Sequence, residues 1–312
     1  MTVGKHSYSL YLWHWPIFSL VDYRFYLSSP TFGLALKVIL SAAATALTYR
    51  VVEGPMRFWL NERRHRAAAF AAFTVAATAL SVAGYFIRYD YYITADTRNV
   101  ATGGISVNPG GRGWVVVIGD SQGAMYGYEL ASLAHTLGFR LNVLSVQDGN
   151  ELPGEPNTLW PKIRHFLNDR KPDVVIVAQA WSSKLREIDA EYFDRAISTV
   201  ADQAAHIIVL TQPPEPPADA TRQAILAGAR PPFFEDPGAT NSRLRANTII
   251  RKIENDRIRV LDVAPIFLER DNSVRVIAPD GRVTYYDRGH LSQSGTALVR
   301  STLEQGLQSL VH

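Results

Sequence analysis

An apolar run that ends in a short polar motif lies at residues 114–122, WVVVIGDSQ. The residues from Trp114 to Ile118 are all β-branched or aromatic, which is typical of a buried strand. Gly119 ends this run, and Asp120 followed by Ser121 is typical of a helix start. A serine where a buried strand gives way to a helix lies at the carboxyl edge of a sheet, where α/β proteins bind ligands. We therefore expect the Ser121 hydroxyl to be exposed in a site.

Further apolar runs recur at the spacing of strand–helix–strand units. The stretches between them have helical spacing, and the one from Met125 to Leu137 ends at Gly138, a common helix stop. This alternation predicts an α/β fold with a parallel sheet flanked by helices. The further runs are residues 141–146, 174–177, 207–210 and 258–261.

A second polar motif lies near the end of the sequence, at residues 287–292, DRGHLS. A serine hydroxyl is a weak nucleophile, so it needs a general base and a carboxylate that orients this base. His290 and Asp287 are three residues apart and can supply both from one turn. Asp120 and Ser121 alone would also fit a simple helix cap. The two motifs together predict a catalytic triad of Ser121, His290 and Asp287.

These motifs resemble the G-D-S and D-x-x-H blocks of the SGNH hydrolase and acyltransferase family. Two earlier motifs, SYSLYLWHWPI at residues 7–17 and EGPMR at residues 53–57, are similar to signatures of the acyltransferase-three family of membrane enzymes. Some members of that family carry a C-terminal SGNH domain. The resemblance implies an α/β, SGNH-like three-layer domain preceded by about three transmembrane helices, with an acyl-serine intermediate on Ser121.

The remaining SGNH blocks supply oxyanion donors, and they are weaker in this sequence. In the family the second block provides a glycine N–H, and Gly149 stands in that place, although an ordinary turn glycine fits there equally well. The third block, normally G-x-N-D, reads AQAWSS at residues 178–183 and has no asparagine. Loss of one oxyanion donor costs about 10²–10³ in rate. Either Gln179 or another group replaces this donor, or the enzyme works with fewer donors.

Three segments, residues 7–27, 32–52 and 67–87, are long and apolar enough to cross a bilayer, which takes about 20 helical residues. Arginines at positions 57, 63, 64 and 66 lie between the second and the third segment. Short loops rich in arginine stay in the cytoplasm. The sequence therefore predicts a protein of the cytoplasmic (inner) membrane whose part after residue 87 is periplasmic or extracellular.

His14 lies inside the first of these segments. A histidine at that depth is costly and by default functional, and the resemblance also implies a role for it in the membrane motif. Trp13 and Trp15 beside it equally fit an aromatic belt at the membrane surface, next to the kink at Pro16. Both interpretations stay open.

Composition fits a membrane part joined to a soluble domain, since 47% of the residues are hydrophobic and the net charge is only +3. This charge balance does not favour nucleic-acid binding. The absence of cysteine excludes disulfides and thiolate metal sites. No His/Asp/Glu cluster has metal spacing, and we expect neither a metal nor a bound cofactor in the soluble domain.

We expect transmembrane segments over residues 1–88, a linker of low apolar content over 89–112, and the catalytic domain over 113–312. A proline-rich stretch from Thr211 to about Asn241 is expected to be an irregular excursion from that domain. Phe233 and Phe234 in it offer either a surface for a sugar ring or an anchor that pins the loop.

The predicted function is membrane-anchored O-acyl transfer, with acetyl as the group and a hydroxyl of a cell-surface glycan as the acceptor, both implied by the resemblance. A carbohydrate O-acetylesterase would use the same triad with water, and a catalytically silent fragment or binding module is a third interpretation. The resembling membrane enzymes have about ten helices, so we expect acetyl-CoA to donate through a membrane partner, or through helices missing from this sequence. Lys37 and His14 are the expected contacts with those helices.

Overall fold

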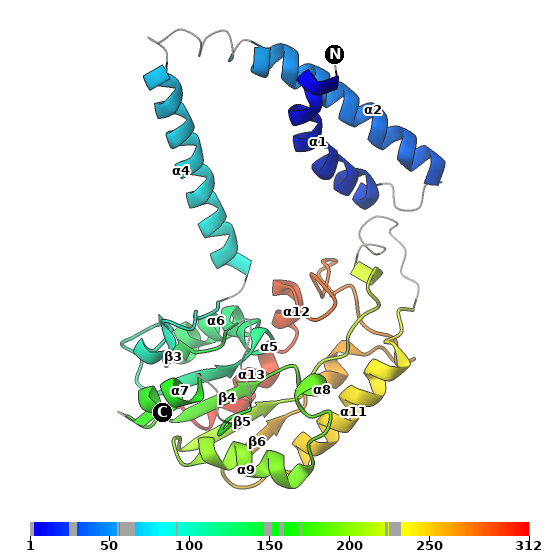
Figure 1. The fold of residues 1–312 in the computed structure, drawn as a ribbon. Helices are drawn as coiled ribbons and strands as arrows, with labels where there is room; N and C mark the ends of the chain where they lie inside the picture. Colours follow the sequence, from blue (N-terminus) through cyan, green and yellow to red (C-terminus); the bar gives the residue numbers. More distant parts are fainter. Residues whose placement is uncertain are drawn as a thin grey trace. The chain divides into compact units, whose positions relative to one another are not determined.

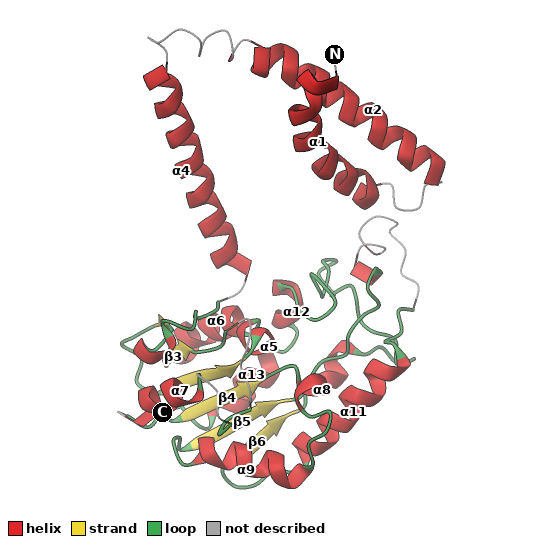
Figure 2. Cartoon of the chain, viewed as in Figure 1, coloured by secondary structure: helices red, strands yellow, loops and turns green. Residues whose placement is uncertain are grey.

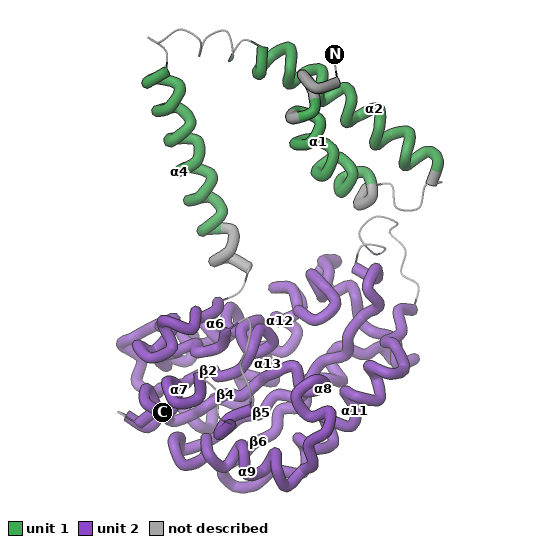
Figure 3. The backbone as a smooth tube through the Cα atoms, in the orientation of Figure 1, with its two compact units in different colours: residues 1–87, 225–229 green, residues 88–224, 230–312 purple. Residues whose placement is uncertain are grey.

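The computed structural model describes residues 3–24, 30–54, 56, 66–91, 93–146, 152–155, 159–168, 170–221, 224 and 232–311. The chain divides into two compact units, coloured separately in Figure 3. The first comprises residues 1–87 with 225–229, and the second comprises residues 88–224 with 230–312.

The first unit contains a pair of packed helices, α1 (Val3–Arg24) and α2 (Pro30–Thr48), and α2 continues through a π-helical turn, η1 (Tyr49–Glu53). Side-chain hydrogen bonds join the pair. Ser9 Oγ donates to Glu53 Oε2 at 2.5 Å, and Trp13 Nε1 donates to Thr48 Oγ1 at 2.7 Å. Polar contacts of this kind hold helices together in lipid, where apolar surfaces gain nothing by association. The first contact also links the two membrane motifs of the sequence.

Two helical segments, Thr31–Glu53 and Arg66–Phe86, are long and apolar enough to cross a membrane, judged by length and composition alone. The second belongs to α4 (Arg66–Tyr91). Among the described residues α1 does not meet the same criterion, and its sequence contains several serine, tyrosine and tryptophan residues besides histidine and charged residues. Of the three spans predicted from the sequence, the one through α1 therefore stays a prediction.

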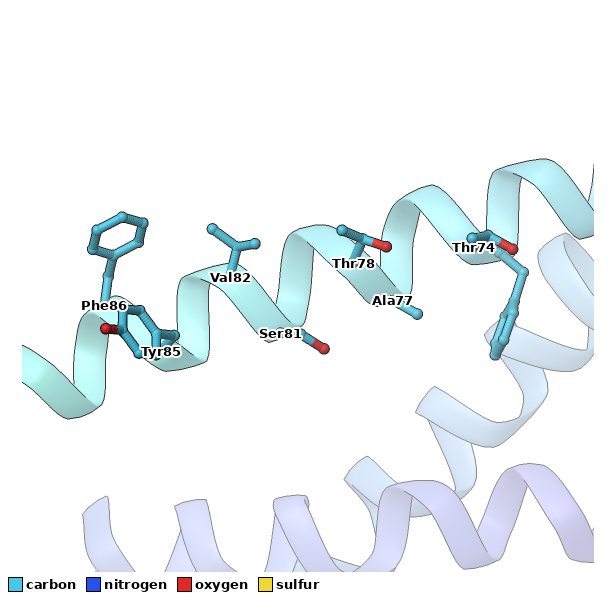
Figure 4. A pocket seen from close by; sticks show the side chains of 8 residues that line it. Thr74, Ala77, Thr78, Ser81, Val82, Tyr85 and Phe86 are labelled. Carbon is cyan, nitrogen blue, oxygen red and sulfur yellow. The ribbon is translucent and has the colours of Figure 1, made fainter. Parts of the chain in front are cut away.

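Hydroxyl and small side chains share a face of α4 (Figure 4). The Thr74 hydroxyl donates to the Phe70 carbonyl at 2.9 Å, so the helix itself satisfies this polar group. Large apolar side chains of α4, including Phe73 and Leu80, are exposed. A helix that exposes such side chains and satisfies its own polar groups is suited to lipid. Thr74, Ala77, Thr78 and Ser81 form the small and hydroxyl part of the face.

The second unit is built on a six-stranded sheet with the order β1-β3-β2-β4-β5-β6 (Figure 1). All neighbouring strands are parallel except β1, which pairs antiparallel with β3. The predicted parallel α/β sheet is therefore confirmed. The strands are β1 (Ile105–Val107), β2 (Trp114–Gly119), β3 (Arg140–Val143), β4 (Val174–Ala178), β5 (His206–Leu210) and β6 (Ile258–Leu261).

Helices cover both faces of the sheet, which gives three layers (Figure 2). Alternate residues of β2 serve the two cores: Val115 and Val117 lie in one cluster, and Val116 and Ile118 lie in the other. The Val115 side packs against α6 (Gly127–Leu137) and α13 (Arg300–Gln308), and the Val116 side against α7 (Trp160–Asn168), α9 (Ala190–Ala201) and α11 (Pro237–Arg251). Shorter helical segments are η3 (Val100–Thr102), α5 (Ser121–Ala124), α8 (Trp181–Lys184), η4 (Ala264–Phe267) and α12 (Gln293–Ala297).

Residues 93–112, which the sequence predicts as part of a linker over 89–112, belong to the second unit. Ile93 and Val100 are buried, and the Ala95 N–H donates to the Ser145 carbonyl at 2.9 Å. β1 lies in the same stretch and forms the edge of the sheet. The stretch looked like a linker because its glycines serve turns, among them Gly104 at φ +59°, around a strand of only three residues.

The sheet places the end of β2 at its switch point. β3 lies on one side of β2 and β4 on the other, so the connections leave β2 in opposite directions, which opens a crevice at its carboxyl end. Gly119 lets β2 and β4 approach there, because a Cβ atom on it would lie 1.9 Å from the Ala178 carbonyl oxygen. Asp120 follows as the N-cap, and Ser121 begins α5.

The proline-rich excursion is shorter than its predicted end at Asn241. α11 already begins at Pro237, and Asp236 caps it by accepting the N–H groups of Gly238 and Ala239. Proline is common in the first turn of a helix because the N–H that it lacks has no intrahelical partner. Phe233 is buried with 8% exposure, so it anchors the loop, whereas Phe234 is 53% exposed.

Candidate active site

Ser121, His290 and Asp287 lie in hydrogen-bonding contact. His290 Nε2 is 2.8 Å from Ser121 Oγ, and His290 Nδ1 is 2.9 and 2.8 Å from the two carboxylate oxygens of Asp287. The nucleophile position comes from the corner between β2 and α5, whereas the other two come from the turn before α12. This is the spatial arrangement that serine acyl-transfer enzymes use on several unrelated folds.

The Asp287 carboxylate fixes the orientation of the imidazole. Its Oδ1 accepts the backbone N–H groups of Gly289 and His290, both at 2.8 Å. An ionised carboxylate only accepts hydrogen bonds, so the proton of the imidazole belongs on Nδ1 and the lone pair on Nε2 faces Ser121. The Tyr286 ring stacks on the imidazole with 5.5 Å between centroids and 15° between planes.

Asp120 ties the ends of two strands together. Its Oδ1 accepts the Gln122 N–H and its Oδ2 accepts the Ala180 N–H, each at 2.9 Å. The first contact caps α5, as expected from the sequence, and the second links the end of β2 to the residues after β4. Burial raises the pKa of the Asp120 carboxyl, against the effect of these two hydrogen bonds and of the Lys184 charge.

Of the two residues predicted to bind the oxyanion, only Gln179 lies in the part of the chain that the structure describes. Gly149 lies outside the described residues. Gln179 directly follows β4 and is 2% exposed. Its neighbour Trp181 is fully buried, donates its indole N–H to the Leu210 carbonyl at 2.8 Å, and packs edge-on against Phe193. Trp181 is therefore a core residue, and the roles of Gly149 and Gln179 stay predictions.

The site is open to solvent on the side of the base. The His290 side chain is 24% exposed and the Asp287 side chain is 46% exposed. A small ester, an acceptor hydroxyl or water can therefore approach the imidazole. Among the described residues no group of three or more His, Cys, Asp or Glu side chains is arranged to hold a metal ion.

His14 belongs to the first unit, in α1. Its Nδ1 donates to the Tyr11 carbonyl at 2.6 Å, and its ring contacts those of Tyr11 and Phe18. Lys37 of α2 lies over the Phe18 ring, 5.2 Å from its centroid. Together these residues place polar groups at the α1–α2 contact, but a functional role for His14 stays a prediction.

The fold and this site define a serine acyltransferase or esterase of the SGNH type. The family model described as "SGNH domain (fused to AT3 domains)" matches residues 91–305. The chain belongs to this family. The matched range includes the edge strand β1, in agreement with its packing in the sheet.

Two similar proteins are acetyltransferases. The O-acetyltransferase OatA of Staphylococcus aureus is 37% identical over 59 residues, which cover 18% of this chain and 10% of that protein. The chain thus matches about a tenth of the curated relative's length. The periplasmic domain of the lipopolysaccharide acetyltransferase of Salmonella ser. Paratyphi A superimposes with a TM-score of 0.52 at 12% identity, and covers 69% of this chain and 90% of that domain. At this identity the likeness shows the fold alone.

Sequence reasoning missed a set of contacts made by the residues that follow β4 and β5 and by Arg288 of the D-x-x-H turn. Gln212 accepts the Ser182 N–H at 2.6 Å, and Arg288 pairs with Glu215 at 3.3 Å. Arg288 lies inside the D-x-x-H motif, so its position was visible in the sequence. Its partner was not, because Glu215 follows a different strand.

Proposed function

We propose that the chain is a membrane-anchored O-acyltransferase in which Ser121 carries an acetyl group to a hydroxyl of a cell-surface glycan. One observation carries this proposal: the Ser121 hydroxyl, at the carboxyl end of β2, lies 2.8 Å from an imidazole that Asp287 orients. The enzyme class follows from the family. The acyl group, the acceptor and the membrane anchor are the proposed parts.

In the first half-reaction the Ser121 oxygen attacks the acetyl carbonyl while His290 Nε2 takes its proton. Asp287 stabilises the imidazolium that forms. The imidazolium then returns the proton to the leaving group, and the acetyl-serine remains. In the second half-reaction His290 removes a proton from the acceptor hydroxyl, whose oxygen attacks the acetyl-serine. The acetylated acceptor leaves, and the proton returns to Ser121 Oγ.

The negative charge of each tetrahedral intermediate needs preorganised N–H donors. We assign this task to the backbone N–H of Gly149 and to the Gln179 side-chain amide. Gln179 suits it because it follows β4, the strand that neighbours β2, and because Asp120 fixes the adjacent Ala180 N–H.

We propose that the acetyl group reaches Ser121 from acetyl-CoA through the membrane. Acetyl-CoA is a charged cytoplasmic thioester, so its acetyl group needs a path through the bilayer. We propose that membrane helices of a partner, or helices outside this sequence, provide that path, and that His14 and Lys37 contact them. The fusion of this family to AT3 domains supports the proposal.

Hydrolysis is the second candidate function, because the exposure of His290 gives water the same access as a sugar hydroxyl. The two functions differ in the fate of one acyl-serine. The full chain in detergent, given a chromogenic acetate ester and candidate glycans, should release the chromophore and acetylate the glycan. Acetylated glycan detected by mass spectrometry supports transfer. Chromophore release with free acetate as the only acetyl product, whichever glycan is added, would make the protein an esterase.

A reporter enzyme that works only outside the cytoplasm should be active when it is fused at His312. The reason is the arginine cluster before α4, which favours the cytoplasm for that segment. With α4 as a span, the part after it lies outside whether or not α1 crosses. A second fusion within residues 57–65 is the control, and there a reporter that works only in the cytoplasm should be active. The reverse pattern would contradict the proposed orientation.

A further inference from the structure

The D-x-x-H turn carries an arginine between its two triad positions. Arg288 Nε lies 3.3 Å from Glu215 Oε2, in an ion pair that joins the turn to the excursion after β5. The Arg288 side chain is 54% exposed and the Glu215 side chain 25%. The acyl-transfer chemistry described above gives no task to either residue.

Glu215 is fixed from the side of the protein. Its backbone N–H donates to Glu235 Oε1 at 2.9 Å, and Gln212 Nε2 lies 3.4 Å from its Oε1. Glu235 is itself held by Arg243, which donates through Nε and Nη2 at 3.0 and 2.7 Å, and both side chains of this second pair are only 5% exposed. The carboxylate that meets Arg288 is therefore anchored on buried groups.

The base of the turn is closed by the Tyr286 N–H, which donates to the His290 carbonyl at 3.2 Å, and by the bridge between Tyr285 and Leu291, but its tip is exposed. Residues 286–288 are exposed, and towards α5 the Gln122 side chain reaches the Gly289 carbonyl only at 3.3 Å. On the side of the excursion the Tyr285 hydroxyl donates to the Pro214 carbonyl at 2.8 Å. The Arg288–Glu215 ion pair adds a second contact between the turn and the excursion, at the exposed part of the turn.

We propose that the Glu215–Arg288 ion pair is a positioning contact that holds the Asp287–His290 turn, so that His290 Nε2 stays within hydrogen-bonding reach of Ser121. The inference rests on the proposed function of that triad. Neither Glu215 nor Arg288 touches the reacting atoms in this role. They act through the backbone of the turn.

The expected effect is on rate rather than on stability. Exposed ion pairs add little to the stability of a fold, whereas a displacement of about 1 Å at a catalytic group costs about 10²-fold in rate. Burial raises the pKa of the Glu215 carboxyl, and the Arg288 charge opposes this effect. The cost of desolvating the half-buried Glu215 carboxylate offsets the attraction to Arg288, so the pair should add little to the stability of the fold. Its expected role is to fix the position of the turn.

The test uses the full chain and a chromogenic acetate ester, with Glu215→Gln, Arg288→Met and the double variant. Each single variant should lower kcat about 10- to 100-fold, with KM and the melting temperature nearly unchanged. The double variant should be no slower than the slower single variant, since both remove the same contact. Glu269→Gln, which breaks the comparable Arg275 pair at 2.9 Å, is the matched control and should keep full kcat.

Arg288→Lys retains the charge and should have a higher kcat than Arg288→Met, which keeps the proposal testable even if the methionine variant folds poorly. Wild-type kcat in both single variants, or losses that multiply in the double variant, would overturn the positioning role. An equal loss in the lysine and methionine variants would also overturn it. Ser121→Ala distinguishes failure of the positioning role from failure of the proposed function. Full activity in that variant would contradict the proposed function itself, whatever the ion-pair variants show.

Discussion

Replacement of Ser121 by alanine should lower ester turnover by about 10⁴- to 10⁶-fold. The reason is that Ser121 Oγ lies 2.8 Å from His290 Nε2, in hydrogen-bonding contact with the base, and alanine leaves no oxygen to form the acyl-enzyme. The fold should survive, because the serine is partly exposed at a corner and Asp120 caps α5 without it. The free energy of unfolding should change by about 0.5 kcal/mol or less.

The decisive measurement is the intact mass after brief reaction with an acetate ester, followed by peptide mapping. The wild-type chain should carry one acetyl group on Ser121, and the alanine variant none. Ser198→Ala, at an exposed serine of α9, is the control and should keep both activity and the adduct. An alanine variant with wild-type turnover would remove Ser121 from the mechanism.

Asp287→Asn should lower kcat by about 10⁴-fold while the shape of the turn persists. Oδ1 of Asp287 accepts two backbone N–H groups, so an asparagine must keep its carbonyl oxygen there and turn its NH₂ group towards His290 Nδ1. An NH₂ group donates, so it selects the imidazole tautomer with the proton on Nε2. That tautomer cannot accept the proton of Ser121.

Asp280→Asn is the matched control. Asp280 also accepts a backbone N–H through Oδ1, from Arg282 at 3.0 Å, and a hydroxyl through Oδ2, from Ser294 at 2.9 Å. No triad group is involved, so its variant should keep normal kcat. Ester hydrolysis by both variants, with the Nδ1 proton followed by NMR, would test the tautomer directly. Equal activity of the two variants would contradict the orienting role of Asp287.

The layers of the fold could be predicted from the sequence because the five parallel strands coincide with short, mainly apolar runs. The edge strand β1 was not readable, since Ile105 and Val107 are only two apolar positions among turn residues. α11 was expected to start later, because Pro237 looks like a loop residue until Asp236 is seen to cap a helix there. Local chemistry therefore predicted what lies in the centre of the sheet and failed at its edge and at helix ends.

At the site, the sequence identified the residues that the structure brings together around Ser121. It did so because chemistry restricts which side chains can activate a serine. The tethers of the turn were beyond sequence reasoning: nothing in the neighbourhood of Glu215 indicates that Arg288 is its partner, since the fold alone creates that contact. The same holds for Asp120, whose bond to the Ala180 N–H depends on β2 and β4 being neighbours.

The contact between Ser121 and His290 spans 169 positions of the chain. During synthesis the β2–α5 corner is therefore made well before the turn that carries the base. Contacts so distant in sequence also form late in folding, because the intervening loop must first be closed. A nascent or truncated chain thus holds a serine without its base. In the proposed mechanism such a chain has no activated serine until the turn that carries His290 has docked.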